Sequence, residues 1–100
     1  KNGREIWRFK TGGPIFSAPT IEDSVVYFGS DDQFVYAVSL ATGMEEWKYR
    51  AQGPVHSHTA VDCGVIFFGS DDKSLYALDT GEGSGCGYSI KARTVCENLP

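Results

Sequence analysis

Two histidines near the middle of the chain have a spacing that suits metal binding. His56 and His58 are separated by one residue, so on an extended strand both side chains would lie on the same face. Imidazole nitrogens are common metal ligands, and in a symmetric ring of chains this face would meet its own copies around an axis. The alternative is a structural pair that is partly buried or faces a channel, because Phe16 and Ala18 stand at the matching positions of an earlier copy of the same pattern.

Two pairs of adjacent aspartates could indicate calcium ligation or acid and base catalysis. Asp31-Asp32 and Asp71-Asp72 both follow the sequence Phe-Gly-Ser. Adjacent side chains on a hairpin usually point apart, and aspartate is favoured in turns because its carboxylate caps nearby backbone amides. We therefore interpret both pairs as turn residues.

The remaining reactive side chains predict no catalytic centre. Ser17 and Ser57 lack histidine and aspartate partners in an arrangement that would make either of them a nucleophile. The three cysteines are odd in number and contain no Cys-x-x-Cys spacing, so neither a zinc site nor a disulfide framework is predicted. Cys63 is interpreted as incidental, and a disulfide between Cys86 and Cys96 stays open for an oxidising compartment.

The composition excludes two classes of partner. The chain has 100 residues and a formal net charge of −4 without a basic cluster, so it lacks the positive patch that nucleic acid requires. Its longest apolar runs are far shorter than the ~20 residues needed to span a bilayer. A hydrophobic fraction of 41% with 13% aromatic residues indicates a folded, strand-rich protein. The compartment is not indicated.

Residues 1–40 align with residues 41–80 without a gap. Trp7 matches Trp47, and the block Phe28 to Asp32 matches Phe68 to Asp72. A period near 40 residues with glycine, aspartate and aromatic punctuation is typical of a repeat architecture in which each repeat is one supersecondary unit. We therefore predict two repeats, 1–40 and 41–80, within a domain of residues 1–80. Residues 81–100 show no alternation and are predicted to form an irregular or disordered tail.

The short-range pattern predicts an all-β protein. An outer strand is expected at about 4–10, three strands at about 16–40, an outer strand at 44–50 and three more at 56–79. In the outer strand Glu46, Lys48 and Arg50 alternate with Trp47 and Tyr49, so one face is charged and the other aromatic. Sheets of four short antiparallel strands at this period are the blades of a β-propeller.

The stretch AVSLATGMEEW resembles the tryptophan-docking motif of the pyrroloquinoline-quinone-like, or quinoprotein-like, propellers, written Ala-x-Asp-x-x-Thr-Gly-x-x-x-Trp. Ser39 stands where the family usually has aspartate. The first copy is cut at its front and keeps only its glycine and tryptophan. The matching positions are Ala37, Thr42, Gly43 and Trp47, with Gly3 and Trp7 in the first copy. The resemblance covers roughly residues 1–79, and it implies that each tryptophan packs flat between adjacent blades on the Thr-Gly turn.

The chain departs from the enzymes of that family. If the resemblance extended to the quinone-dependent dehydrogenases, it would imply a cofactor and a calcium ion bound by polar residues from several blades, often under two adjacent cysteines. No Cys-Cys pair occurs in this chain. The third motif also fails, because Ala77 to Gly81 brings its Thr-Gly two residues early and no tryptophan follows. We therefore expect a protein that is not an enzyme and has no cofactor.

Two blades cannot close a ring alone. The second predicted blade lacks its outer strand, while residues 4–10 form an outer strand without a blade, so several copies are expected to join head to tail. Four copies would give eight blades, the usual number in the resembling family, and three would give six. We predict a cyclic tetramer first and a trimer second, with Ile6, Trp7 and Phe9 at the subunit junction.

Three functions remain open at this point. The first is a non-catalytic propeller module, a scaffold or protein-interaction unit that meets a protein or peptide ligand on its loop faces or central channel. The second is a fragment of a quinone-dependent dehydrogenase, with quinone and calcium on the propeller axis. The third is a truncated relic of a longer propeller protein with no independent role.

Overall fold

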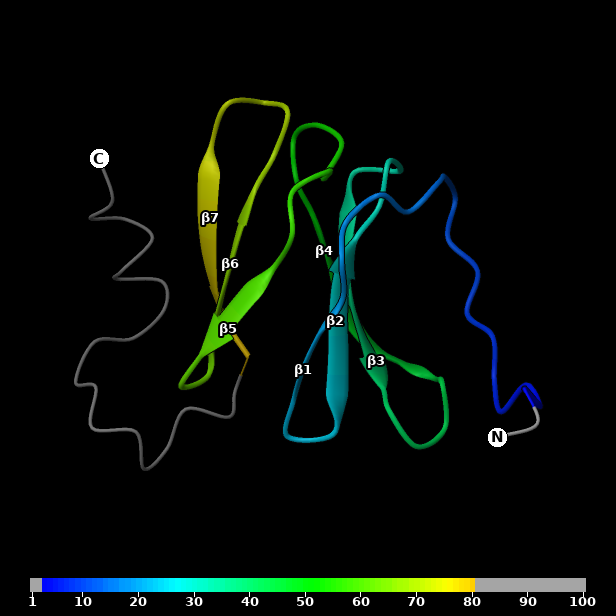
Figure 1. Ribbon diagram of the computed structural model, residues 1–100. Helices are drawn as coiled ribbons and strands as arrows, with labels where there is room; N and C mark the ends of the chain where they lie inside the picture. Colours follow the sequence, from blue (N-terminus) through cyan, green and yellow to red (C-terminus); the bar gives the residue numbers. More distant parts are fainter. Residues whose placement is uncertain (1–2, 81–100) are drawn as a thin grey trace.

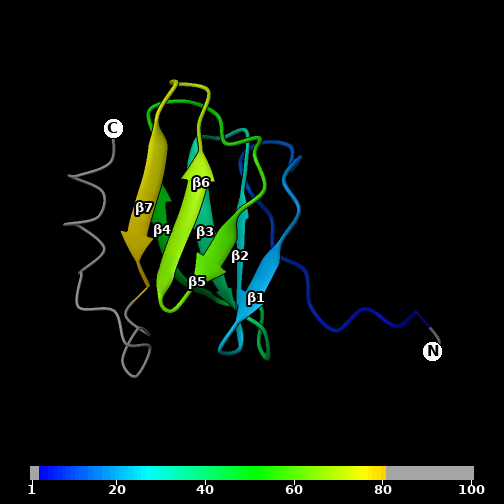
Figure 2. The same ribbon diagram turned by 60° about the vertical axis from the view of Figure 1, so that its left-hand side comes forward.

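The computed structural model describes residues 3–80, which form two antiparallel sheets lying side by side (Figures 1 and 2). The first sheet has the order β1 (Thr20–Glu22), β2 (Val25–Gly29), β3 (Phe34–Ser39) and β4 (Glu45–Arg50). The second has the order β5 (Ala60–Asp62), β6 (Val65–Gly69) and β7 (Leu75–Asp79). Each strand pairs with its neighbour in sequence, and within the described residues there is no helix.

Two-residue turns join the first two strands of each sheet. Asp23 and Ser24 have φ values of 53° and 65°, and Cys63 and Gly64 have values of 52° and 82°. Turns with positive φ at both central residues suit the right-handed twist of a hairpin. The strands around them are rich in β-branched and aromatic residues, which favour a pleated, buried surface.

A tight turn also separates β2 from β3. The Ser30 N–H donates to the Phe34 carbonyl (3.0 Å), and the Gln33 N–H donates to the Ser30 carbonyl (3.2 Å). Asp32 caps the turn, since its Oδ1 accepts a hydrogen bond from the Phe34 N–H at 3.0 Å. The interpretation of the aspartate pairs as turn residues is confirmed here, and Asp72 caps the matching turn through the Ser74 N–H (2.8 Å).

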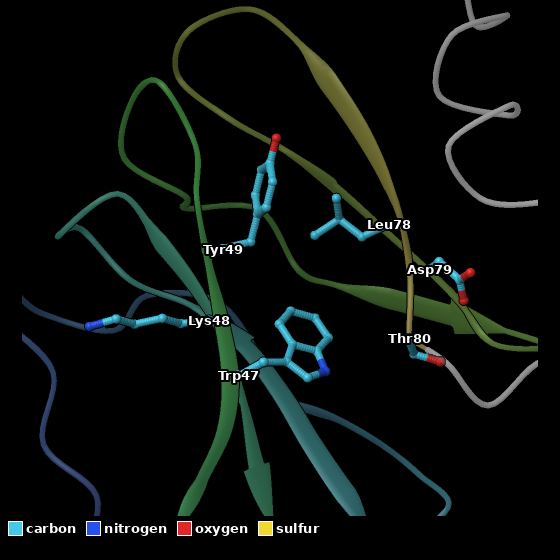
Figure 3. A pocket seen from close by; sticks show the side chains of 6 residues that line it. All are labelled: Trp47, Lys48, Tyr49, Leu78, Asp79 and Thr80. Atoms are coloured by element: carbon cyan, nitrogen blue, oxygen red, sulfur yellow. The ribbon is translucent and has the colours of Figure 1, made fainter.

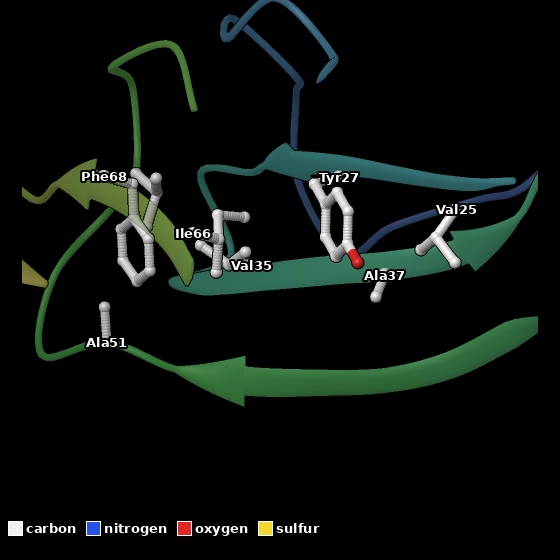
Figure 4. Packing of buried hydrophobic residues seen from close by; sticks show 8 residues of the cluster. Val25, Tyr27, Val35, Ala37, Ala51, Ile66 and Phe68 are labelled. Carbon is white, nitrogen blue, oxygen red and sulfur yellow. The ribbon is translucent and has the colours of Figure 1, made fainter. Parts of the chain in front are cut away.

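The main core lies between the two sheets (Figure 4). Side chains on alternate positions of β2 and β3 meet side chains of β6, and Tyr27 and Phe68 are almost fully buried there. The other face of the first sheet carries a second, smaller cluster. The two clusters consist of Val25, Tyr27, Val35, Ala37, Ala51, Val55, Ile66 and Phe68, and of Val26, Phe28, Tyr36 and Val38.

Two expected strand positions differ from the structure. Residues 3–19 contain no strand within the described chain, so the predicted outer strand at 4–10 is an unpaired segment that runs along the face of the first sheet turned away from the second sheet (Figure 1). The innermost strands begin at Thr20 and Ala60, later than the expected 16 and 56. Before each of these strands, a serine side chain accepts a backbone hydrogen bond in place of a strand ladder: Ser17 from the Gly29 N–H and Ser57 from the Gly69 N–H.

Candidate functional site

The unpaired segment 3–14, which we call the arm, lies against the first sheet through two aromatic side chains. The Trp7 indole N–H donates to the Leu40 carbonyl at 2.8 Å. Trp7 also covers Gly43, where a Cβ would lie only 2.6 Å from the indole. The Phe9 ring lies 5.3 Å from the Tyr36 ring in an edge-on contact. The arm therefore has a defined position although it belongs to no sheet in the described chain.

Strand β4 lies against the second sheet in the same manner (Figure 3). Trp47 and Tyr49 point toward Leu78, while Lys48 points the opposite way. The Tyr49 ring lies 5.9 Å from the Tyr76 ring, which matches the contact of Phe9 with its tyrosine one repeat earlier. A cleft of about 360 Å³ lies between β4 and the end of β7.

Backbone hydrogen bonds repeat this equivalence. The Asp31 N–H donates to the Pro14 carbonyl at 2.9 Å, and the Asp71 N–H donates to the Pro54 carbonyl at 2.9 Å. The carboxylate of the next aspartate accepts from the Gly12 N–H at 2.9 Å in one repeat and from the Gln52 N–H at 3.2 Å in the other. Residues 7–14 therefore lie on the first sheet as residues 47–54 lie on the second.

The two copies differ in their backbone pairing. Strand β4 forms a ladder with β3, in which Trp47 is opposite Ala37 and Arg50 is opposite Phe34. No strand of the described chain pairs with the arm, and none pairs with the outer edge of β7. Within residues 3–80, the arm therefore lacks the ladder that β4 has with β3, and β7 lacks the outer strand that β3 has in β4.

The junction between the sheets depends on a glycine. A Cβ on Gly29 would lie 2.2 Å from Val55 Cγ1, so only glycine allows this approach. The Val55 N–H donates to the Ser30 carbonyl at 3.1 Å, and its side chain is completely buried. The segment that follows β4 is in this way fixed to the first sheet before the second sheet begins.

The matching residues elsewhere in the chain are open. Ile15 corresponds to the buried valine of the junction and is 46% exposed. It lines an apolar groove of about 210 Å³ together with Trp7, Phe9, Pro19 and Phe28. At Gly69, the counterpart of the junction glycine, a Cβ would meet only the side chain of Ser57, at 3.7 Å, among the described residues.

The turn aspartates form hydrogen-bonded pairs with tyrosines. Burial, the strongest single influence, raises the pKa of Asp32, but hydrogen bonds from the Tyr36 hydroxyl and from the Gly12 and Phe34 N–H groups outweigh it, so the pKa lies below its usual value. Burial and the hydrogen bond to the carboxylate raise the pKa of Tyr36 well above its usual value. In the second repeat the hydrogen bond from the Tyr76 hydroxyl likewise lowers the pKa of Asp72. Burial, followed by the hydrogen bond to Asp72, raises the pKa of Tyr76.

The two histidines are not on a strand, contrary to the expectation that they share a face of the innermost strand. They precede β5, and each has its own partner from the first repeat. His56 contacts Asp31 and lies 3.4 Å from Asp71, and its ring stands edge-on to Phe16. His58 Nδ1 accepts a hydrogen bond from the Ala18 N–H at 2.9 Å.

The described residues do not bring His56 and His58 together with further metal ligands. Within residues 3–80 there is no group of three or more histidine, cysteine, aspartate or glutamate side chains that could hold a metal ion. Metal binding by His56 and His58 around the axis of a ring therefore stays a prediction.

Sequence reasoning did not identify the structural role of two serines. Ser17 Oγ accepts from the Gly29 N–H (2.8 Å) and lies 3.1 Å from the Gly29 carbonyl. Ser57 Oγ makes the same two contacts with Gly69, at 2.8 and 3.0 Å. Their identical position in the two repeats was the available signal.

Cys63 does not fit the expectation that it is incidental, because it is disulfide-bonded. It occupies the first position of the turn between β5 and β6. The proposed pair of Cys86 with Cys96, like the predicted tail at 81–100, lies outside the described residues.

The residues of the resembling motif surround the turn between β3 and β4. Ser39 Oγ accepts from the Thr42 N–H at 3.3 Å, which gives this serine a bond where the family usually has aspartate. Thr42 Oγ1 accepts from the Met44 N–H at 3.2 Å. Both motif glycines, Gly3 and Gly43, have positive φ, at 71° and 76°. The role of the motif in docking tryptophan between blades stays a prediction.

The predicted subunit-junction residues lie together on the arm. Ile6 is 82% exposed, whereas Trp7 and Phe9 are half-buried against the first sheet. Within residues 3–80, no helix has the length and apolar character that a bilayer span requires.

Comparisons with solved structures give the fold. The computationally designed Ika4 protein superposes with a TM-score of 0.70 at 17% identity over 82% of this chain and 51% of its own length. BamB from Moraxella catarrhalis gives 0.68 at 18% identity over 78% of this chain, and the designed Ika8 protein gives 0.61 at 16% over 76%. The chain spans only 25% and 24% of those two proteins.

The likeness of these structures establishes an all-β, β-propeller-like architecture. A comparison with curated protein sequences gave no significant match. The family model described as "Outer membrane protein assembly factor BamB" matches residues 1–85, which is most of the chain. The chain therefore belongs to this family of pyrroloquinoline-quinone-like propeller-repeat proteins.

Proposed function

We propose that this protein is a non-catalytic β-propeller module, a scaffold or protein-interaction unit that assembles head to tail from copies of itself into a closed ring. One observation carries the proposal: the arm lies on the first sheet as residues 47–54 lie on the second, yet it lacks the sheet that it would complete. The edge of β7 lacks an outer strand in the described chain. A second copy would supply each with its partner.

The family description supports a role in handling proteins. It names an outer membrane protein assembly factor. We extend to this chain, as part of the proposal, only the general role of contacting other proteins. Four chains would complete an eight-bladed ring and three a six-bladed ring, both within the usual range of propellers. A protein or peptide ligand would then be met on the loop faces or in the central channel of the ring.

The mass of the protein in solution tests the proposal. We expect light scattering after size-exclusion chromatography to give one discrete species of three or four chains over a range of concentrations. A protein that remains a single chain at every concentration would contradict self-assembly. A species of two chains would give four blades and would contradict the predicted ring of six or eight blades.

Two tryptophan variants sharpen this test. Trp47→Ala removes a side chain from the core between the sheets, so we expect about 2 kcal/mol lower stability of each chain, less than the ~3–5 kcal/mol of a fully buried tryptophan. Trp7→Ala removes an aromatic from the predicted junction and should lower the oligomer mass at a given concentration. A Trp7→Ala protein that stays fully oligomeric would count against the arm as part of the junction.

A further inference from the structure

The outward face of the second sheet and the adjacent edge of β7 have the features of a docking surface, which we call the open face. Along β6 and β7 every second residue packs toward the first sheet, so the residues between them point the other way. Leu75 is 57% exposed on this face. The residues that point this way are Val65, Phe67, Gly69, Leu75 and Ala77, of which Val65 and Ala77 are already buried, with 7% and 1% of their surface exposed. The open part of the face therefore consists of Phe67, Gly69 and Leu75. The counterparts of all five residues one repeat earlier form the buried side of the junction: Val25, Tyr27, Gly29, Val35 and Ala37.

We infer that the open face binds residues 5–15 of a second copy of this chain, in the register that residues 45–55 have on the first sheet. The inference rests on the proposed self-assembly and deepens it by naming the two surfaces and their register. The partner is another copy because both halves of the junction are present on one chain, and because the junction between the two repeats already shows how such halves fit together.

The ladder between β3 and β4 gives the backbone register. Phe34 is opposite Arg50 and Ala37 is opposite Trp47. One repeat later this places Ser74 opposite the partner's Lys10 and Ala77 opposite the partner's Trp7. The pairing supplies backbone hydrogen bonds between the arm and the edge of β7, neither of which pairs with a strand of residues 3–80.

A side-chain socket gives a second, independent fit. Val55 fills the space over Gly29, and its N–H bonds to the Ser30 carbonyl. By the same geometry the partner's Ile15 would fill the open space over Gly69, with its N–H directed at the Ser70 carbonyl. The half-exposed isoleucine and the open glycine are therefore complementary surfaces of one chain.

Docking would require little rearrangement of the arm. Trp7 and Phe9 already hold the arm on its own first sheet. The contact of Phe9 with Tyr36 matches the contact that Tyr49 of β4 makes with Tyr76 on the second sheet. The apolar groove of about 210 Å³ beside them faces the side from which a preceding copy would approach. The open face of that copy would fill the groove with its Phe67 and Leu75, much as Tyr27 and Val35 fill the junction within the chain.

Disulfide trapping between full-length chains tests the register. One preparation carries Lys10→Cys and a second carries Ser74→Cys, both at exposed positions. Opposed residues in an antiparallel pair have Cβ atoms about 4.5–5.5 Å apart, close enough for a disulfide after slight adjustment. We expect a covalent dimer in the mixture after mild oxidation, with residues 10 and 74 joined in the peptides found by mass spectrometry.

A displaced pair serves as the control for trapping. Glu5→Cys mixed with Ser74→Cys places the thiols about 17 Å apart along an extended strand, so this mixture should give no specific dimer. If the displaced pair links as well as the matched pair, the register is wrong. If residue 74 links instead to Cys86 or Cys96 of its own chain, the end of the chain occupies the open face and the inference is overturned.

Gly69→Ala tests the socket without damaging the single chain. Among residues 3–80 the added Cβ would make only an ordinary contact with Ser57, so the thermal midpoint of the dissociated protein should be unchanged. Against the partner's Ile15 it would collide as a Cβ on Gly29 would collide with Val55, so we expect association to weaken at least about tenfold.

The outcomes separate this inference from the proposed function. An oligomeric wild type with unchanged assembly in Gly69→Ala and no link between residues 10 and 74 would overturn the docking mode while the self-assembled propeller stands. A wild type that is a single chain at all concentrations would overturn both. Assembly lost in Gly69→Ala, together with the matched link, would support both.

Discussion

The junction inside the chain and the two outer faces are built from matching residues but differ in burial. Val55 is completely buried at the junction, whereas Ile15 at the same position of the first repeat is 46% exposed. Gly29 is closely covered, whereas Gly69 is open among the described residues. The difference lies in the presence of a neighbouring repeat, because the local backbone contacts of the two repeats are nearly the same.

This comparison shows which properties of a repeat are local and which depend on its neighbour. The hydrogen bonds from the Gly29 and Gly69 N–H groups to serine hydroxyls form in both repeats, and so do the aspartate caps of the turns. Apolar burial on the outer faces requires an adjacent repeat, as in other repeat proteins whose stability is a sum of unit and interface terms.

The largest effect is expected where the junction glycine is changed. Gly29→Ala would place a Cβ 2.2 Å from Val55 Cγ1 and 3.0 Å from the Val55 carbonyl oxygen, so the two sheets would have to separate. We expect a loss of about 3 kcal/mol in the free energy of unfolding, at the upper end for overpacked cores. Urea unfolding followed by tryptophan fluorescence measures it. A loss below about 1 kcal/mol would mean that the junction is loosely packed in solution.

A smaller, pH-dependent effect is expected at the turn aspartate of the first repeat. The pKa of Asp32 lies below its usual 3.8, so its carboxylate contributes stability above that pH, and the contribution is lost as the pH falls through the lowered pKa. Asp32→Asn should therefore cost about 1 kcal/mol at neutral pH, allowing for solvent screening, and nothing in strong acid.

The corresponding variant of the second repeat provides the comparison for this effect. Asp72 has the same direction of pKa shift, caused first by the Tyr76 hydroxyl, but the residues on either side of it are more exposed than those beside Asp32. Asp72→Asn should change the thermal midpoint less than Asp32→Asn between neutral pH and strong acid. Equal effects at both positions would show that the neighbouring repeat does not strengthen the cap.

Local sequence patterns predicted the strands of the two hairpins well. Strands β2, β3, β6 and β7 follow β-branched and aromatic runs, and β4 follows the alternation of charged and aromatic residues in its six-residue segment. Their side-chain period and their turns are encoded by adjacent residues, so a single repeat carries the information. The all-β propeller class follows from the repetition of these hairpins.

The parts that the sequence did not predict depend on contacts between repeats. Residues 4–10 have the alternation of a strand, but a ladder needs a second edge, which the described chain does not offer them. The expected strand at His56 and His58 is replaced by bonds to Asp31 and Ala18, residues of the other repeat that no local pattern indicates. The disulfide of Cys63 likewise has no local sign in its spacing.

The smallest expected effect compares the two turns that open the hairpins. Ser24 has a φ of 65°, in the left-handed region, where its counterpart in the second repeat is Gly64 with a φ of 82°. A side chain in this region costs about 1–2 kcal/mol, while glycine gives the unfolded chain about 0.4–1 kcal/mol of extra freedom. Ser24→Gly should therefore stabilise the protein by about 0.5 kcal/mol, visible as a rise in the thermal midpoint.

The reciprocal variant, Gly64→Ser, tests whether the strain lies in the turn itself. Gly64→Ser should destabilise the second hairpin by a similar amount, since the carbonyl at each position accepts a comparable bond, from Leu40 N–H at 2.9 Å and from Thr80 N–H at 2.8 Å. Opposite signs for the two variants would show that turn strain is a local property of each repeat. If both variants destabilise the protein, the serine side chain contributes to the first turn in a way that its backbone conformation does not explain.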